Sequence, residues 1–217
     1  MPDFDFKVTG VEAANRGIAP LLHFKLEIAN HPETEKIHTV ILQTQIQIEA
    51  PRRSYNDAEK EKLGELFGTP DRWGQTLRNR LWGISNTNVR GFSGSTETVL
   101  PMPCTFDLNV AATKYFHALE GGAIPLLFLF SGTVFYEAAD GRLQVQQISW
   151  NKECHFQMPS ETWREMMDRH FPNSAWLYLH RGVFDQLYAF KRKHGFSSWE
   201  ETISGLLNAE EKVEVPA

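Results

Sequence analysis

Residues 21–30 read LLHFKLEIAN, and this stretch decides the fold class. Its apolar residues occupy every second position, which is the pattern of a β-strand with one buried face. Residues 4–10 (FDFKVTG) and 37–50 show the same alternation on either side of it. The turn-forming sequence at 30–33 (NHPE) separates two of these segments. The three segments predict an antiparallel sheet in the N-terminal part of the chain.

The hydrophobic period then changes to that of helices. We interpret residues 54–82 as a helical insertion of two helices, the first of them capped by Ser54. Strand patterns return after residue 82, including one at 105–111. The long apolar run at 123–135 (AIPLLFLFSGTVF) predicts a central strand. Asp140-Gly141 predicts the hairpin turn that follows it.

The C-terminal part of the chain has helical spacing again. We predict helices over residues 158–208 and a short acidic tail at 209–217. Ser197 and Glu200 match a capping box at the start of the last helix.

The patterns together predict a mainly β protein with helical additions (α+β). The expected architecture is an immunoglobulin-like antiparallel β-sandwich over residues 1–157 with the helical insertion at 54–82. The helices of residues 158–208 are expected to pack on this sandwich. A chaperone-like antiparallel sheet with flanking helices is the alternative fold.

Composition narrows the class of protein. The 217 residues are 41% hydrophobic and 23% charged, as in globular proteins, and the formal net charge of −5 disfavours a general nucleic-acid binder. The longest apolar run, 123–130, is far shorter than the roughly 20 residues of a membrane-spanning helix. Two cysteines and an acidic, alternating N-terminus without signal-peptide character predict a cytoplasmic location.

Charge is unevenly distributed along the chain. Residues 51–90 hold eight Lys and Arg against five Asp and Glu, whereas residues 195–217 hold one Lys against five Glu. Both segments are explained by solvated surfaces, and the basic one is also suited to an acidic partner.

Motifs for nucleophilic or phosphate chemistry are missing or incomplete in the sequence. Residues 91–95 (GFSGS) resemble the G-x-S-x-G elbow of hydrolases, but the fifth position is Ser95 and a strand pattern follows. Neither a P-loop nor a dinucleotide-binding glycine motif occurs. An enzyme remains one alternative, and its site would be assembled from scattered residues around a deep pocket.

Metal binding is a second alternative, as a carrier or sensor. The candidate ligands are Cys104, His117, Cys154 and His155. Their spacing matches no zinc or metalloprotease motif, and neighbouring residues of a strand such as Cys154 and His155 point to opposite faces. We therefore predict no cofactor from a motif.

The favoured interpretation is a protein without catalytic activity that binds another protein. Trp and Arg are enriched at binding hot spots. The candidate partner-binding residues are Arg72, Trp73, Arg78, Arg80 and Trp82. Core packing, with arginine side chains lying on indole rings, is the alternative for Trp73 and Trp82.

Distinctive runs along nearly the whole chain resemble an uncharacterised bacterial family, a domain of unknown function. They include RRSY at 52–55, RWG at 72–74, LPMPCT at 100–105, KYFHAL at 114–119 and FPNSAW at 171–176. Genes of this family often lie near those of nickel–iron uptake hydrogenases. The resemblance thus implies an accessory role in assembly or maturation of such an enzyme, with a hydrogenase subunit or a maturation factor as partner.

Overall fold

The computed structural model describes residues 1–14, 17–105, 110–174 and 177–211. The chain divides into two compact units, residues 1–174 and residues 175–217, and each is described by itself. No helix among the described residues has the length and apolar character needed to cross a membrane.

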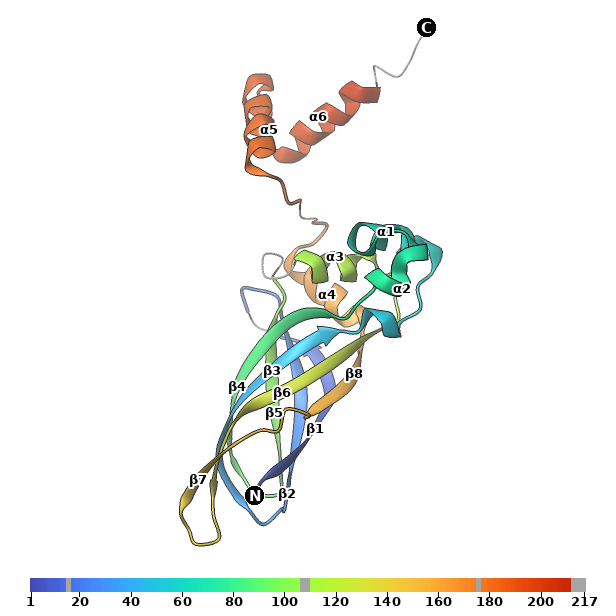
Figure 1. Cartoon of the computed structure of the whole chain (residues 1–217). Coiled ribbons are helices and arrows are strands. Elements are labelled where there is room, and N and C mark those ends of the chain that lie inside the picture. Colours follow the sequence, from blue (N-terminus) through green and yellow to red (C-terminus); the bar gives the residue numbers. More distant parts are fainter. Residues whose placement is uncertain (15–16, 106–109, 175–176, 212–217) are drawn as a thin grey trace. The chain divides into compact units, whose positions relative to one another are not determined.

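Two antiparallel sheets form the body of the first unit (Figure 1). The three-stranded sheet has the order β1 (Asp3–Ala13), β2 (Leu21–His31) and β5 (Ser95–Pro103). The larger sheet has the order β4 (Arg80–Phe92), β3 (Lys36–Ile48) and β6 (Ala123–Glu137), with β7 (Leu143–Gln147) and β8 (Glu153–Pro159) both paired to β6. Strands and helices together confirm the α+β prediction, while immunoglobulin-like connectivity stays a prediction.

The core lies between the apolar faces of the two sheets. The ring of Phe6 on β1 stacks on Phe130 of β6 with centroids 4.1 Å apart. Phe24 of β2 meets Phe128 of β6 edge to face at 5.1 Å. The alternating apolar residues of β2 are fully buried, and each such side chain contributes about 1.5–3 kcal/mol to folding. The strand prediction for residues 21–30 is therefore confirmed.

Strand β6 is central in its sheet, as its apolar run predicted. One of its edges pairs with β3, and the other pairs first with β8 and then with β7. Gly132 lies on β6 with φ of 144°, and a Cβ atom there would stand 2.1 Å from the carbonyl oxygen of Ile41. Only glycine fits this close approach of two strands. The predicted turn at Asp140-Gly141 joins β6 to β7, and the Gly141 amide donates to the Ala138 carbonyl.

Short helices gather at one end of the sheets (Figure 1). They are η1 (Ala50–Arg52), α1 (Asp57–Phe67), η2 (Pro70–Arg72), α2 (Trp73–Thr76), α3 (Val110–Ala118) and α4 (Ser160–His170). The helical insertion is shorter than predicted, because β4 already begins at Arg80, where it pairs with the end of β3. The cap of α1 is Asn56 rather than Ser54, since the Asn56 side chain accepts the Glu59 amide at 2.8 Å.

The strand predicted at 105–111 is wrong for its last two residues, which begin α3. Residues 106–109 of that prediction lie outside the described residues. The apolar spacing at 110–118 fits a helix as well as a strand, and helical packing against α1 and α4 decides between them.

The second unit contains two helices, α5 (Arg181–His194) and α6 (Trp199–Glu211). The Phe184 and Trp199 rings, 5.3 Å apart, hold them together. The capping box of α6 is one residue later than predicted, because the Glu201 amide donates to Ser198 Oγ at 3.0 Å. Helix α6 runs to Glu211, and residues 212–217 of the predicted tail lie outside the described residues.

Candidate functional site

Trp82, one of the predicted partner-binding residues, lies in the core. It is 5% exposed and meets Phe24 and Phe116 edge to face at 6.0 and 4.9 Å. A β-bulge causes this placement, because the register of β3 with β4 shifts between Leu81 and Gly83 and leaves Trp82 as the extra residue. The bulge turns the indole inward and leaves Leu81 48% exposed.

The other predicted partner-binding residues fall into two groups. Trp73 and Arg80 both pack on Phe67, with the indole centroid at 6.1 Å and the guanidinium carbon at 4.7 Å from the ring. Arg72 and Arg78 are exposed. Two of the five predicted side chains are therefore exposed, and Arg78 Nε also donates to the Gln75 carbonyl.

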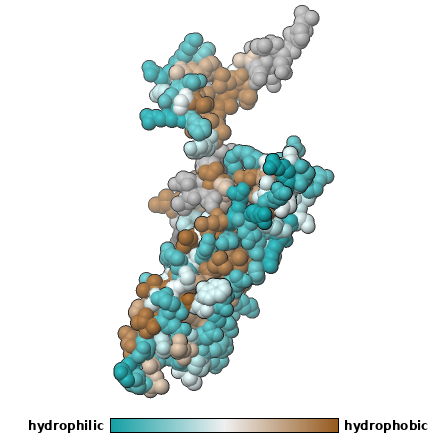
Figure 2. Space-filling view, in the orientation of Figure 1, coloured by the Kyte–Doolittle hydropathy of each residue, from teal (hydrophilic) through white to brown (hydrophobic). Residues whose placement is uncertain are grey.

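The outer face of the larger sheet, next to this segment, carries an apolar surface. Strand register aligns Leu81, Gln47 and Leu127 in one row across β4, β3 and β6, and Ile84, Gln45 and Leu129 in the next row. Leu81 and Ile84 are 48% and 49% exposed, and the other four side chains are half-buried. We call these six residues the sheet patch. Apolar and hydrophilic surface are interspersed over these strands in Figure 2.

A polar cluster continues one row of the sheet patch onto β8. His155 pairs with Leu127 in the strand register, and its Nδ1 lies 2.9 Å from a carboxylate oxygen of Glu49. Arg52 Nε lies 3.3 Å from the other carboxylate oxygen. The Glu49 side chain is 6% exposed, so the Arg52 guanidinium and the His155 ring cover a nearly buried carboxylate.

The four predicted metal ligands do not form a centre. Cys154 and His155 point to opposite faces of the sheet, as predicted, and burial raises the pKa of the Cys154 thiol. His117 lies on α3 against Trp163, and burial lowers its pKa. Within the described part of the chain, no three His, Cys, Asp or Glu side chains are arranged to hold a metal ion.

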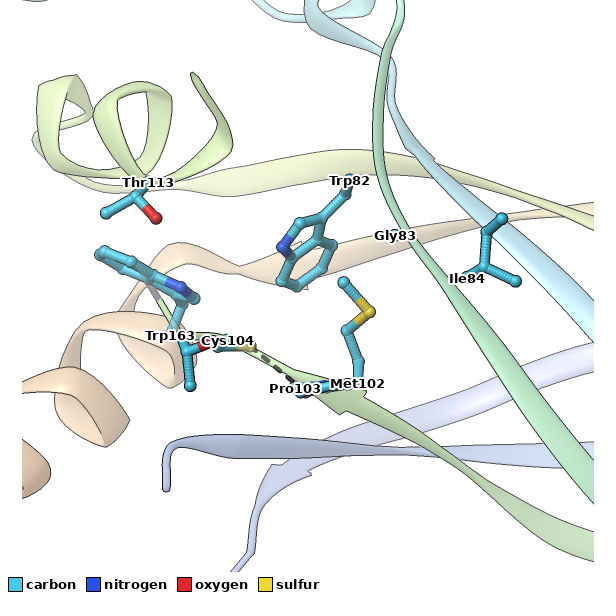
Figure 3. A pocket seen from close by; sticks show the side chains of 9 residues that line it. Trp82, Gly83, Ile84, Met102, Pro103, Cys104, Thr113 and Trp163 are labelled. Carbon is cyan, nitrogen blue, oxygen red and sulfur yellow. Dashed lines mark hydrogen bonds between the residues drawn. The ribbon is translucent and has the colours of Figure 1, made fainter. Parts of the chain in front are cut away.

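Cys104 lines a small pocket (Figure 3). The pocket has a volume of about 210 Å³, and its described lining is Trp82, Gly83, Ile84, Met102, Pro103, Cys104, Thr105, Thr113 and Trp163. The Cys104 thiol donates to the Met102 carbonyl at 3.3 Å, and burial raises its pKa to about 12. A thiol with that pKa is protonated at neutral pH and is a poor nucleophile. None of the described lining residues is acidic, basic or a histidine, so general acid–base chemistry has no candidate among them.

A buried ion pair that the sequence patterns did not reveal holds the helical end of the unit. Arg53 Nη2 lies 2.7 Å from Glu59 Oε1, and the side chains are 10% and 4% exposed. Glu59 also accepts the Glu120 amide, and Arg53 donates to the Ala123 carbonyl. The pair therefore ties α1 to the segment that leads into β6. The Asn56-x-x-Glu59 capping box was the available sequence signal for Glu59.

Tyr55, from the same RRSY run, makes further contacts at the helical end of the unit. Its hydroxyl lies 2.8 Å from the Tyr115 hydroxyl on α3 and donates to the Ala50 carbonyl. Burial raises the pKa of both phenols. These contacts give the RRSY run a structural role.

A family of unknown function, DUF6084, matches residues 1–215. The chain belongs to this family. No curated protein matches the chain. The match confirms the uncharacterised family inferred from the sequence and carries no information on hydrogenase genes.

Several solved structures resemble parts of the chain. The putative ApaA protein from Bordetella pertussis has 12% identity and a TM-score of 0.28, and the match covers 73% of this chain and 95% of that one. A putative late embryogenesis abundant protein has 12% identity and a TM-score of 0.29, with 73% and 72% covered. β-Glucosidase 3B from Thermotoga neapolitana has 15% identity and a TM-score of 0.25, and the match covers 72% of this chain but only 17% of the enzyme. TM-scores this low indicate neither the fold nor the function of this chain.

Proposed function

We propose that this member of the family is a non-catalytic accessory protein of the cytoplasm that binds another protein through the sheet patch. The observation that supports the proposal is the exposure of Leu81 and Ile84 on the open face of the larger sheet. Isolated exposed apolar residues are common, but here four apolar side chains lie in two adjoining rows, as one pair on β4 and one pair on β6 with Gln45 and Gln47 of β3 between them. A protein partner is the occupant that such a surface fits.

The chemistry around the sheet patch favours a protein over a lipid or an apolar small molecule. Gln45 and Gln47 alternate with the leucine and isoleucine side chains, and their amides can pair with a polypeptide backbone. Arg78 is exposed three residues before Leu81, and arginine is enriched at protein interfaces. A mixture of apolar and polar side chains is usual at such an interface, which as a whole is about as apolar as the rest of a protein surface.

We further propose that the partner is a nickel–iron hydrogenase subunit or one of its maturation factors. This part rests on the gene neighbourhood that the family resemblance implies. Hydrogenase subunits and maturation factors are therefore the first partners to test.

The test compares the binding of full-length variants to purified hydrogenase subunits and maturation factors. Leu81→Glu/Ile84→Glu is expected to weaken binding at least about 100-fold, because charges would be buried without partners. Val99→Glu is the matched control, since Val99 is 42% exposed on β5 of the other sheet. Circular dichroism verifies that both variants fold. Equal binding by the wild type and the folded double variant would contradict the role of the sheet patch.

A further inference from the structure

The second unit lacks a core of its own. Among residues 177–209, whose side chains are described, Thr202 is the only buried one. Two helices of 14 and 13 residues are too short to be stable in water without tertiary packing. They therefore need a further surface to complete them.

Within the second unit, each helix keeps a partly exposed apolar face, and on α5 this includes Phe184 and Tyr188, whose rings also contact Trp199 of α6. On α5, Val183, Phe184 and Tyr188 are 52%, 43% and 48% exposed. On α6, Leu206 and Leu207 are 39% and 59% exposed. Figure 2 shows hydrophobic surface on these helices. Residues three or four positions apart share one side of a helix, so Phe184 and Tyr188 form a stripe on α5. Ile203, which is 38% exposed, forms one with Leu206 and Leu207 on α6, and another helix can cover each stripe.

The two helices carry opposite charge. Helix α5 has four Lys and Arg against one Asp, and three of the basic residues, 191–193, lie in its last turn. Helix α6 has four Glu and neither Lys nor Arg. A partner of uniform charge would match one helix and repel the other.

We propose that a second copy of this chain covers the apolar faces, with α5 of each copy packed on α6 of the other. A two-fold axis makes both contacts at once, because in such an interface residue i meets j while j meets i. Each basic helix then lies on an acidic one, and four apolar faces form one four-helix core. The proposal does not depend on the sheet patch, because it uses different residues.

The first test is sedimentation equilibrium of the full chain. The wild type is expected to have twice the monomer mass of 24.9 kDa at micromolar concentration. Val183→Glu/Leu207→Glu places charges in the proposed core and is expected to give monomers. Val145→Glu, at a 57% exposed position on β7, is the matched control and stays dimeric. A monomeric wild type, or a double variant that remains dimeric, would overturn the proposal.

A charge swap tests the pairing itself. Arg192 and Lys193 of α5 and Glu200 of α6 are exposed. Arg192→Glu/Lys193→Glu and Glu200→Lys are each expected to weaken self-association, because like charges then face each other across the interface. In a mixed dimer of the two variants both contacts join opposite charges, so mixing is expected to give a dimer with a dissociation constant at least about tenfold lower than that of either variant alone. The absence of preferential mixing would overturn the α5–α6 pairing.

The two proposals fail separately. Leu81→Glu/Ile84→Glu is expected to remain dimeric while it loses the partner. Val183→Glu/Leu207→Glu is expected to keep the partner's binding site on each monomer. Loss of self-association by the first variant would place the dimer contact on the sheet patch and overturn the helical dimer.

Discussion

Trp82 and Cys104 show how far individual residues can be interpreted from the sequence. A tryptophan next to arginines is compatible with an interface or with a core, and residue type alone does not separate the two. The bulge in β4 decides that Trp82 lies in the core, and this bulge arises from the pairing of β4 with β3. No local pattern around residue 82 encodes it, because it depends on which strand becomes the neighbour. Cys104 similarly becomes unreactive through burial, which spacing motifs do not report.

The pKa of Cys104 makes a testable prediction. In a Cys154→Ser chain, Cys104 is expected to resist an aromatic disulfide reagent at pH 8 in native buffer and to react fully in denaturant.

The raised pKa of Cys104 also makes stability depend on pH. Between the usual thiol pKa of 9.0 and about 12, the unfolded chain loses the proton that the folded chain keeps. Stability therefore falls as pH rises above 9.0. Denaturation curves should show a steeper loss for the wild type than for Cys104→Ala, and fast native labelling would contradict the burial of this thiol.

At the scale of elements, strands were predicted better than helices. The period-two pattern of β1 to β3 is preserved because one face of each strand is buried along its length. Residues 80–82 belong to the predicted helical insertion but form the start of β4, because pairing with the end of β3 outweighs local propensity. The observed helix caps lie one or two residues from the predicted ones. Residues that can cap a helix, such as Ser and Asn, occur at several neighbouring positions there, so the sequence does not show which of them is the cap. The Arg53–Glu59 pair was missed because its burial depends on contacts with Glu120 and Ala123, which are distant in sequence.

That ion pair gives the element-scale prediction. Glu59→Ala leaves the Arg53 guanidinium buried without its carboxylate and the Glu120 amide without its acceptor. The free energy of unfolding is expected to fall by roughly 3–5 kcal/mol, which is usual when one partner of a buried pair is removed. Urea denaturation followed by circular dichroism measures it. Lys60→Ala breaks the exposed Lys60–Asp57 pair and is the control, with a loss of under about 1 kcal/mol. Equal losses for the two variants would mean that the pair does not anchor α1.

The whole molecule combines a well-packed unit with one that is not self-sufficient. Residues 1–174 bury aromatic and aliphatic side chains between two sheets, whereas the helices of the second unit leave their apolar faces open. The sequence predicted both groups of helices without showing this difference, because amphipathic spacing marks a face to be covered and not what covers it. These observations support the two proposals together, with one stable body that binds a partner and a helical pair that self-associates.

Hydrogen–deuterium exchange of the full chain tests most directly whether the sheet patch binds a protein. It is measured for the chain alone and for its complex with a purified hydrogenase subunit or maturation factor. Slower exchange on binding is expected in residues 80–84 of β4 and 125–129 of β6, since a partner would cover the rows that these strands form. A complex in which exchange is unchanged in both segments and slowed only elsewhere would contradict it.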